Sequence, residues 1–201
     1  GVVSDIFAAL GAKSILAEFP ELCGVEQELM NRCVDEEKAD KFLTLMKAFE
    51  KSVVDAGSGF DMNPSPGNIK DGLITDAMKS AGASKKGGTS PIVGVFDDAE
   101  CTTGLVGSGA TVVLFTTGLG NPMGNPIAPV VKISSNTALI NRMSDIIDVN
   151  AGTVITGEKT ITEVGAEIVD YIIELASGNV ETKADHLKQD VFIPWKRGVS
   201  L

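Results

Sequence analysis

The alternation of apolar and polar positions predicts helices separated by short buried strands. Apolar residues recur at helical spacing through the longest such segment, residues 25–57, which Gly57 ends. A later segment, residues 160–178, has the same spacing and ends at Gly178, a residue type favoured just after a helix. Helical patterns are found in residues 1–10, 25–57, 69–82, 136–147, 160–178 and 181–190.

Short apolar runs between these helices are predicted to be strands. They occupy residues 13–19, 91–97, 111–117 and 128–134, and none of them alternates with polar residues. Strands of this kind, separated by helices, indicate a parallel sheet covered on both faces. We therefore predict an α/β fold, a Rossmann-like layered architecture with helices on both faces of a parallel sheet. Residues 190–201 are expected to form an extended, ordered tail.

Ligands of parallel α/β sheets bind at the loops that follow the strands. The loops selected by this rule are residues 85–91, 115–126, 132–139 and 148–155. In the first, Gly87 and Gly88 free the backbone to turn its N–H groups toward an anion, and Lys85 or Lys86 supplies positive charge. A simple turn leading into the next strand stays an open alternative.

The second of these loops, residues 115–126, is too polar and too long to be only a connection. Its G-x-G lacks the third glycine of a dinucleotide fingerprint and runs into proline, so no nucleotide cofactor is predicted. In the third loop, Asn136 suits either a ligand contact or a helix N-cap. The fourth places Asp148, Asn150 and Gly152 in a tight turn, which we expect to border the same site as Lys132.

Composition narrows the function further. The net charge of -10 and pI near 4.6 argue against nucleic acid or an anionic membrane as partner, because both require a cationic surface. No apolar run is long enough to span a bilayer, so a cytoplasmic protein is expected. The three cysteines form no C-x-x-C pair and are expected to be reduced. The single histidine, His186, lies in a polar segment, which opposes a catalytic triad or a multi-histidine metal site.

Glutamates gather where a predicted strand meets a predicted helix, at Glu18, Glu21, Glu26 and Glu28. Carboxylates near a helix N-terminus are favoured by the helix dipole whatever the function. As a group they also suit a hard cation or a general base. Both interpretations stay open.

Ordered motifs along the whole chain carry a family resemblance. They are AEFPELCGVEQELMNRCVD, NPSPGNIKDGL, KKGGTSPIVGV, LFTTGLGNPMGNPIAPVVKISSNTALINRM, DIIDVNAG and FIPWKRGVSL. The chain resembles the C-terminal catalytic region of the altronate and galactarate dehydratase family, which includes the large subunit of sulfolactate sulfo-lyase. The resemblance implies a hydro-lyase that dehydrates a sugar acid such as altronate or galactarate by β-elimination, with a divalent metal, Fe(II), as the expected cofactor. Two subdomains, with a break near 57–70, stay open.

The resemblance and the loops together define a candidate site. The catalytic candidates are Lys86, Lys132 and Asp148. The substrate-binding candidates are Asn63, Ser65, Gly67, Asn68, Gly87, Gly88, Thr89, Thr116, Thr117, Gly118, Asn121, Asn136 and Asn150. The metal candidates are Glu18 and Glu21. We expect the polar side chains of these loops to converge on one pocket at the carboxyl-terminal edge of the sheet.

The resemblance also implies partners, and the chain departs from the family pattern in places. The expected partners are a small acidic sugar or sulfonated acid and an N-terminal β-clip domain or subunit, without which we expect no activity. A homo-oligomer stays open. Family members carry about twenty more residues between Asp98 and Thr103, within the range of functional loops. Met78 and Gln27 replace the family's glutamate and histidine. The open alternatives are a sulfolactate sulfo-lyase subunit and a non-catalytic acid-binding domain.

Overall fold

A computed structural model describes residues 1–18, 22, 24–57, 76–95 and 101–192, and every structural statement below refers to these residues. The backbone contacts divide the chain into two compact units, the first made mainly of Val3–Ala99 and the second mainly of Glu100–Pro194. The break predicted near 57–70 lies almost entirely outside the described residues and stays a prediction. Each unit is described by itself.

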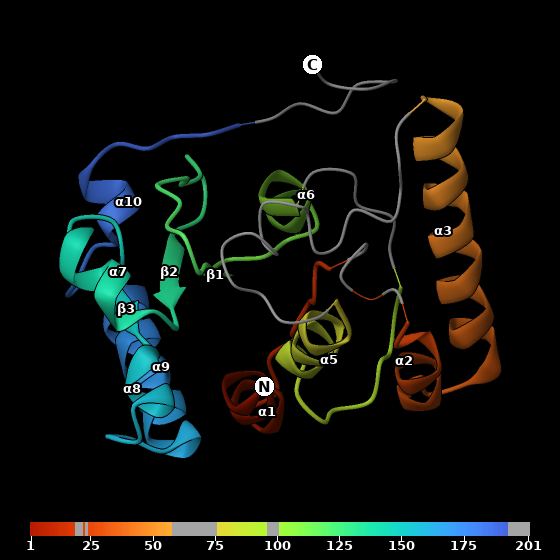
Figure 1. Ribbon diagram of the computed structural model, residues 1–201, viewed down its shortest axis with the longest axis horizontal. Helices are drawn as coiled ribbons and strands as arrows, with labels where there is room; N and C mark the ends of the chain where they lie inside the picture. Colours follow the sequence, from red (N-terminus) through yellow and green to blue (C-terminus); the bar gives the residue numbers. More distant parts are fainter. Residues whose placement is uncertain (19–21, 23, 58–75, 96–100, 193–201) are drawn as a thin grey trace. The chain divides into compact units, whose positions relative to one another are not determined.

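The first unit is helical. Its helices are α1 (Val2–Ala9), α2 (Glu26–Arg32), α3 (Glu36–Asp55) and α5 (Asp76–Lys86), and α2 packs beside α3 (Figure 1). The single helix predicted over residues 25–57 is wrong in this detail, because it is broken between α2 and α3. Asp35 causes the break: its backbone is extended, and its side chain accepts a hydrogen bond of 2.8 Å from the backbone N–H of Lys38, which starts a new helix.

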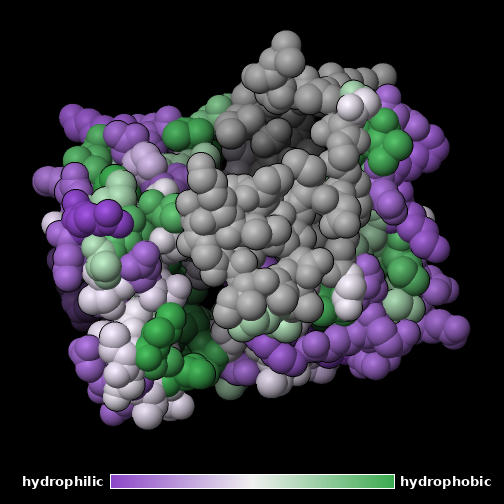
Figure 2. Space-filling model, viewed as in Figure 1, coloured by the Kyte–Doolittle hydropathy of each residue, from purple (hydrophilic) through white to green (hydrophobic). Residues whose placement is uncertain are grey.

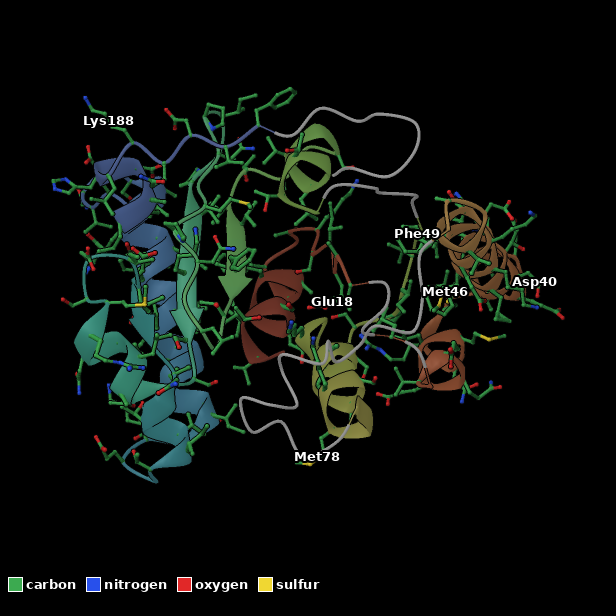
Figure 3. The ribbon with its side chains drawn as sticks, turned by 45° about the horizontal axis from the view of Figure 1, so that its top comes forward. Glu18, Asp40, Met46, Phe49, Met78 and Lys188 are labelled. Atoms are coloured by element: carbon green, nitrogen blue, oxygen red, sulfur yellow. The ribbon has the colours of Figure 1, made fainter. Side chains whose placement is uncertain are left out.

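The apolar core of the first unit lies against one side of α3. In Figure 3, Met46 and the exposed Asp40 lie on opposite sides of this helix, as its amphipathic sequence requires. Hydrophilic side chains dominate the drawn surface over α3 in Figure 2. The buried members of the core are Leu22, Leu29, Phe42, Met46 and Ala83. Burial of these side chains fixes α2, α3 and α5 together.

Neither strand predicted for the first unit forms. Residues 13–18 belong to no helix or strand, and residues 13–15 are exposed. Of residues 91–95, the part of this run that the structure describes, only Ile92 takes part in β pairing, as an isolated bridge with Cys33. A run of apolar residues therefore does not predict a strand reliably here, because a strand also needs a neighbouring strand to pair with along its length.

The second unit contains the parallel sheet. Its strands β1 (Val113–Thr116), β2 (Val130–Ser134) and β3 (Val149–Asn150) are all parallel and stand in the order β1-β2-β3. Every residue of the central β2 is buried, which explains why its sequence does not alternate. The predicted layered α/β fold with a parallel sheet is confirmed.

Helices complete the second unit. They are α6 (Cys101–Gly107), α7 (Thr137–Arg142), α8 (Gly152–Ile155), α9 (Ile161–Ala176) and α10 (Lys183–His186). The helix predicted over 160–178 is confirmed: Thr160 and Glu163 form a capping box, and Gly178 has a positive φ of 74° after the last turn. The helix α6 was not predicted, since its glycines and threonines are weak helix formers.

The described part of the tail and the outer surface bear on two further predictions. Residues 191–192 belong to no helix or strand, and Gly124 forms an isolated parallel bridge with Asp190. Lys188, labelled in Figure 3, lies just after α10. Its φ is positive, 54°, and His186 is exposed. No helix among the described residues is both long and apolar enough to cross a bilayer. The cytoplasmic location stays a prediction.

Candidate functional site

Residues 85–91, here called the Gly-Gly loop, are held by a carboxylate from α1. The backbone N–H of Thr89 donates to Asp5 Oδ1 at 2.7 Å, and the Ser90 hydroxyl lies 3.4 Å from the same oxygen. Gly88 has a φ of 70°, and a Cβ added there would lie 2.3 Å from Asp5 Oδ1. The N–H of Thr89 thus does meet an anion, as predicted for this loop, but the anion is the protein's own Asp5. The Thr89 N–H keeps the pKa of the Asp5 carboxyl below its usual value.

Arg32, at the end of α2, holds the same loop through its carbonyls. Its guanidinium donates to the carbonyls of Ser84 at 3.1 Å, Gly87 at 3.3 Å and Ser90 at 3.2 Å. Five donors in a rigid fork allow one arginine to gather several carbonyls. Sequence analysis missed both Asp5 and Arg32, because nothing in the sequence indicates that these distant residues meet residues 85–91.

The two lysines of the Gly-Gly loop are both paired with glutamates. Lys86 Nζ pairs with Glu18, whose side chain is 12% exposed, and Lys85 Nζ pairs with Glu28, whose side chain is 37% exposed. Desolvation makes an ion pair more dependent on its partner. Lys86, the predicted catalytic lysine, is therefore the more firmly held of the two.

The described residues do not fit a metal site. Glu18 pairs with Lys86, while Glu21, the other metal candidate, lies outside the described ranges. Within those ranges, no group of three or more histidine, cysteine, aspartate or glutamate side chains is placed to hold a metal ion. We therefore derive no chemical step through a metal.

Residues 117–129, here called the Asn-Pro loop, follow β1 directly and are shaped by their own side chains. Thr117 Oγ1 accepts from the N–H of Gly120 at 3.0 Å, and Asn121 Oδ1 accepts from the N–H of Met123 at 2.8 Å. The buried Asn125 accepts from the N–H of Ile127 at 2.9 Å. These are Asx- and ST-type turns, in which short polar side chains take the place of secondary structure.

The carboxyl-terminal edge of the sheet brings several predicted residues together. The N–H of Thr117 donates to the carbonyl of Ile133 at 2.9 Å, which places the start of the Asn-Pro loop beside the end of β2. Asn136 caps α7 through the N–H of Leu139 and approaches the carbonyl of Gly118 at 3.5 Å. Asn136 thus acts as a helix N-cap through its Oδ1, while its Nδ2 faces the Asn-Pro loop. The predicted ligand contact therefore stays compatible with the cap.

Asn150 extends this edge to β3. Its Oδ1 accepts from the N–H of Gly152 at 2.9 Å and from the Thr137 hydroxyl at 3.2 Å. A Cβ added at Gly152 would lie 2.4 Å from Thr137 Oγ1, so only glycine allows this approach. The exposed Thr116 ends β1 at the same edge. The structure therefore gathers Thr116, Thr117, Gly118, Asn136 and Asn150 at one edge of the sheet.

Lys132 lies in the middle of β2 and is fully buried, with 0% exposure. Its Nζ donates to the carbonyl of Met123 in the Asn-Pro loop and lies 5.5 Å from the centroid of the Phe115 ring. Burial lowers the pKa of its ammonium to about 8, against the opposing attraction of Asp148 and Asp185. Direct contact between Lys132 and a substrate stays a prediction.

Asp148 binds the protein's own groups. Its Oδ2 accepts from the backbone N–H of Lys132 at 2.6 Å, and its Oδ1 accepts from the N–H of Lys183 at 2.8 Å. The Tyr171 hydroxyl lies 3.2 Å from Oδ1, and burial together with this carboxylate raises the pKa of Tyr171. Asp148 is thus near Lys132, as predicted, and its oxygens join β2, α9 and α10.

The remaining predicted residues are placed as follows. Asn63, Ser65, Gly67 and Asn68 lie outside the described residues. The candidates Lys86, Gly87, Gly88 and Thr89 belong to the first unit, whereas those from Thr116 to Asn150 belong to the second. Their convergence on one pocket stays a prediction.

One hollow in the second unit lies at the other end of the sheet. It is lined by residues 125–129, which precede β2, and by Leu175, Val180, Glu181 and Asp185. Two of these side chains are acidic and none is basic. This hollow is a poor site for an acidic substrate, because its carboxylates repel an anion. We assign the candidate site to the carboxyl-terminal edge instead.

Comparison with known proteins identifies the family. The model of the D-galactarate/altronate dehydratase C-terminal family matches residues 1–101 and 96–200, so the chain belongs to this family. The resemblance drawn from the sequence motifs is confirmed.

The curated relatives agree with this assignment. The chain is 36% identical to galactarate dehydratase (L-threo-forming) of Escherichia coli, with 96% of this chain and 41% of that protein aligned. It is 34% identical to altronate dehydratase of the same organism, over 100% of this chain and 44% of that protein. It is 29% identical to (2R)-sulfolactate sulfo-lyase subunit beta of Chromohalobacter salexigens, over 96% of this chain and 55% of that protein. The chain thus spans less than half the length of the two dehydratases.

The alignments also locate a difference from the family. The aligned lengths with the two dehydratases, 216 and 219 residues, exceed the 201 residues of this chain. The two matched stretches of the family model meet at residues 96–101. Both observations support the prediction that family members carry additional residues between Asp98 and Thr103.

Proposed function

We propose that this chain is the C-terminal region of a hydro-lyase that dehydrates a sugar acid, altronate or galactarate. The observation that carries the proposal is the cluster of hydroxyl, amide and backbone groups at the carboxyl-terminal edge of the sheet, in a chain that belongs to a dehydratase family. Such neutral donors suit a polyhydroxy acid, whose hydroxyls both donate and accept hydrogen bonds. The names of the relatives supply the two candidate substrates.

Dehydration by β-elimination sets the groups that the enzyme must provide. A base removes the proton next to the carboxylate, the C–O bond at the neighbouring carbon breaks, and the leaving hydroxide takes a proton to form water. The resulting enol rearranges to a keto acid. We propose Lys86 and Asp148 for these proton transfers or for binding the carboxylate, Lys132 as a third charged group of the site, and Thr116, Thr117 and Asn121 as hydrogen-bond partners of the hydroxyls.

The Gly-Gly loop is proposed as the second part of the site. Lys86 supplies positive charge there, and its pairing with the largely buried Glu18 keeps it in one place. Gly87, Gly88 and Thr89 follow Lys86 directly in the loop, and the N–H of Thr89 donates to Asp5. The Thr89 N–H of this loop donates to the carboxylate of Asp5, which supports the proposal of a carboxylate ligand by its chemistry.

A metal and a further protein region are part of the same proposal. A divalent ion, Fe(II), requires ligands beyond the described residues, since these hold no suitable cluster. We also propose that activity requires an N-terminal β-clip region, because the relatives extend well beyond the part that matches this chain. Metal analysis of the purified complete protein, with and without chelator treatment, tests the first statement. Adding the N-terminal region in trans to this chain tests the second.

A sulfo-lyase is the alternative function, favoured by the similarity to (2R)-sulfolactate sulfo-lyase subunit beta. In that reaction a C–S bond breaks and sulfite leaves. Sulfite release from sulfolactate, without turnover of altronate or galactarate, establishes this alternative. Binding of the acids without turnover of any of them indicates a non-catalytic acid-binding domain.

The decisive experiment compares two adjacent lysines in the complete protein. Product keto acid is measured with altronate and with galactarate for the wild type, Lys86→Met and the matched control Lys85→Met. We expect Lys86→Met to lower kcat/KM at least about tenfold, the equivalent of one lost charged contact, and Lys85→Met to have little effect. Equal activity of both variants and the wild type excludes the Gly-Gly loop from the site.

A further inference from the structure

The side chain of Lys132 lies in the buried central strand and not at the exposed edge of the sheet. It stands on the central strand, with β1 on one side and β3 on the other, and its residue is 0% exposed. It makes no ion pair with any described carboxylate. Burying an ammonium without an ion-pair partner lowers the stability of the fold, because the charge loses its hydration. We therefore expect Lys132 to have a role other than stabilisation.

The group that the ammonium binds is a backbone carbonyl of the Asn-Pro loop, that of Met123. The same residue's N–H is bound by the side chain of Asn121 at 2.8 Å. Met123 is therefore held on both of its backbone polar groups, by Lys132 on one and by Asn121 on the other. The next residue, Gly124, is fixed by the carbonyl of Gln189 at 2.8 Å. The orientation of Asn121 thus depends on a peptide segment that Lys132 anchors.

We propose that Lys132 is a positioning residue, which holds the Met123 carbonyl and so sets the conformation of the Asn-Pro loop for substrate binding by Thr117 and Asn121. This inference rests on the proposed function for its catalytic consequence. In this proposal Lys132 does not contact the substrate; it affects substrate binding through the conformation of the Asn-Pro loop.

The surroundings of the ammonium predict how this anchor responds to pH. The charged groups that act on it are Asp148 beside β3 and Asp185 on α10, the Phe115 ring on β1 lies 5.5 Å away, and Tyr171 on α9 contacts Asp148. Burial lowers the Lys132 pKa to about 8 in spite of the two aspartates. Above this pH the amine is neutral, donates a weaker hydrogen bond, and loses its attraction to the Phe115 ring. The Asn-Pro loop is then expected to loosen.

The experiment uses the complete protein and compares Lys132→Met with Lys159→Met. Lys159 pairs with Glu167 at the surface, which makes it a matched control for loss of one lysine charge. Hydrogen exchange of residues 117–129 is followed by mass spectrometry, and KM and kcat are measured with altronate and galactarate. We expect Lys132→Met to speed exchange in the loop and to raise KM about tenfold with a smaller fall in kcat, and Lys159→Met to change neither.

The contrary outcome is a large loss of kcat with unchanged exchange of the loop, which shows that Lys132 acts on the substrate itself.

If Lys132→Met does not fold, the wild type still decides between a positioning role and direct action on the substrate. Its loop exchange, corrected for the intrinsic effect of pH and normalised to α9, is expected to rise between pH 7 and 9 as the lysine passes its pKa of about 8. A constant ratio to α9 overturns the proposal. If the wild type turns over neither acid, the proposed function fails while the exchange measurement still decides the anchoring by Lys132.

Discussion

The Gly-Gly loop and the Asn-Pro loop are both polar and glycine-rich, but they are held in opposite ways. The Gly-Gly loop is gripped by side chains of other elements, the carboxylate of Asp5 and the guanidinium of Arg32. The Asn-Pro loop is held by hydrogen bonds from its own backbone to Thr117 and Asn121. The Lys132 ammonium on β2 also donates to its Met123 carbonyl. The first arrangement joins distant parts of the chain, whereas the second uses mainly nearby residues, apart from the contact of Gly124 with Gln189.

The charged side chains of the two arrangements also differ in their exposure to solvent. Asp5 and Arg32 are only partly buried, so solvent weakens their electrostatic contacts. Lys132 is fully buried and the carboxylate of Asp148 accepts hydrogen bonds beside it, where the dielectric is low. Changes in the second unit are therefore expected to have larger effects than comparable changes at the Gly-Gly loop.

The largest effect is expected at Asp148. Replacing Asp148 by alanine removes the acceptor for the backbone N–H groups of Lys132 and Lys183, and it leaves the Tyr171 hydroxyl with only the carbonyl of Glu181. Because each unsatisfied buried donor costs about 1–3 kcal/mol, the free energy of unfolding should fall by roughly 3 kcal/mol or more. Denaturant unfolding of the complete protein measures this. The control is Asp145→Ala, an exposed aspartate in the same segment, and equal effects of the two changes contradict the role of Asp148.

A smaller effect is expected at Gly88 of the Gly-Gly loop. Gly88→Ala places a methyl group 2.3 Å from Asp5 Oδ1 at a φ of 70°, whereas Gly11→Ala meets open space at a φ of 87°. Both carry the backbone cost of about 1–2 kcal/mol, and only Gly88→Ala also displaces the carboxylate. Gly88→Ala should therefore be less stable than Gly11→Ala by about 1 kcal/mol. Adding Asp5→Ala should remove most of that difference, and its persistence shows that the clash lies elsewhere.

The contrast between the loops also explains which features of the fold the sequence revealed. The strands β1 and β2 and the helix α9 were predicted because burial and helical periodicity are local patterns. Residues 13–18 and 91–95 have similar apolar runs, but the first are largely exposed and the second pair only at Ile92. The sequence of a strand does not contain the identity of its partner.

The same limit applies to the candidate site. Asn121 was selected because it lies in a polar loop after a strand, and Asn136 because it suits a helix N-cap or a ligand contact; both are local features of the sequence. Asp5 and Arg32 were missed because their partners at Thr89 and Gly87 are far along the chain. For Lys132, the sequence showed a lysine within an apolar strand, and only the structure shows that its partner is the Met123 carbonyl.

The two lysines of the Gly-Gly loop should differ by no more than the two glycine variants. Lys86→Met leaves Glu18 without its partner at 12% exposure, whereas Lys85→Met leaves Glu28 at 37% exposure, where water replaces the lysine. We expect Lys86→Met to lower the free energy of unfolding by about 1 kcal/mol and Lys85→Met to change it very little. Thermal melting of both variants checks the order. A larger loss for Lys85→Met reverses the ranking of the two ion pairs.

The smallest effect is expected from acid acting on Asp5. The Thr89 N–H lowers the pKa of this carboxyl in the folded protein, so its contribution to stability is present above the unfolded pKa, about 3.9, and is lost as pH falls through the lower folded value. Other carboxylates titrate in the same range, so the useful quantity is the difference between the wild type and Asp5→Asn. That difference should be constant from pH 7 to about 5 and should shrink toward zero below about pH 4 as the wild-type carboxyl becomes neutral. Hydrogen exchange at the Thr89 amide is the local measurement, because this amide loses its charged acceptor in the variant at every pH. A difference that grows at low pH contradicts the assignment of Asp5 as the ionised acceptor of the Gly-Gly loop.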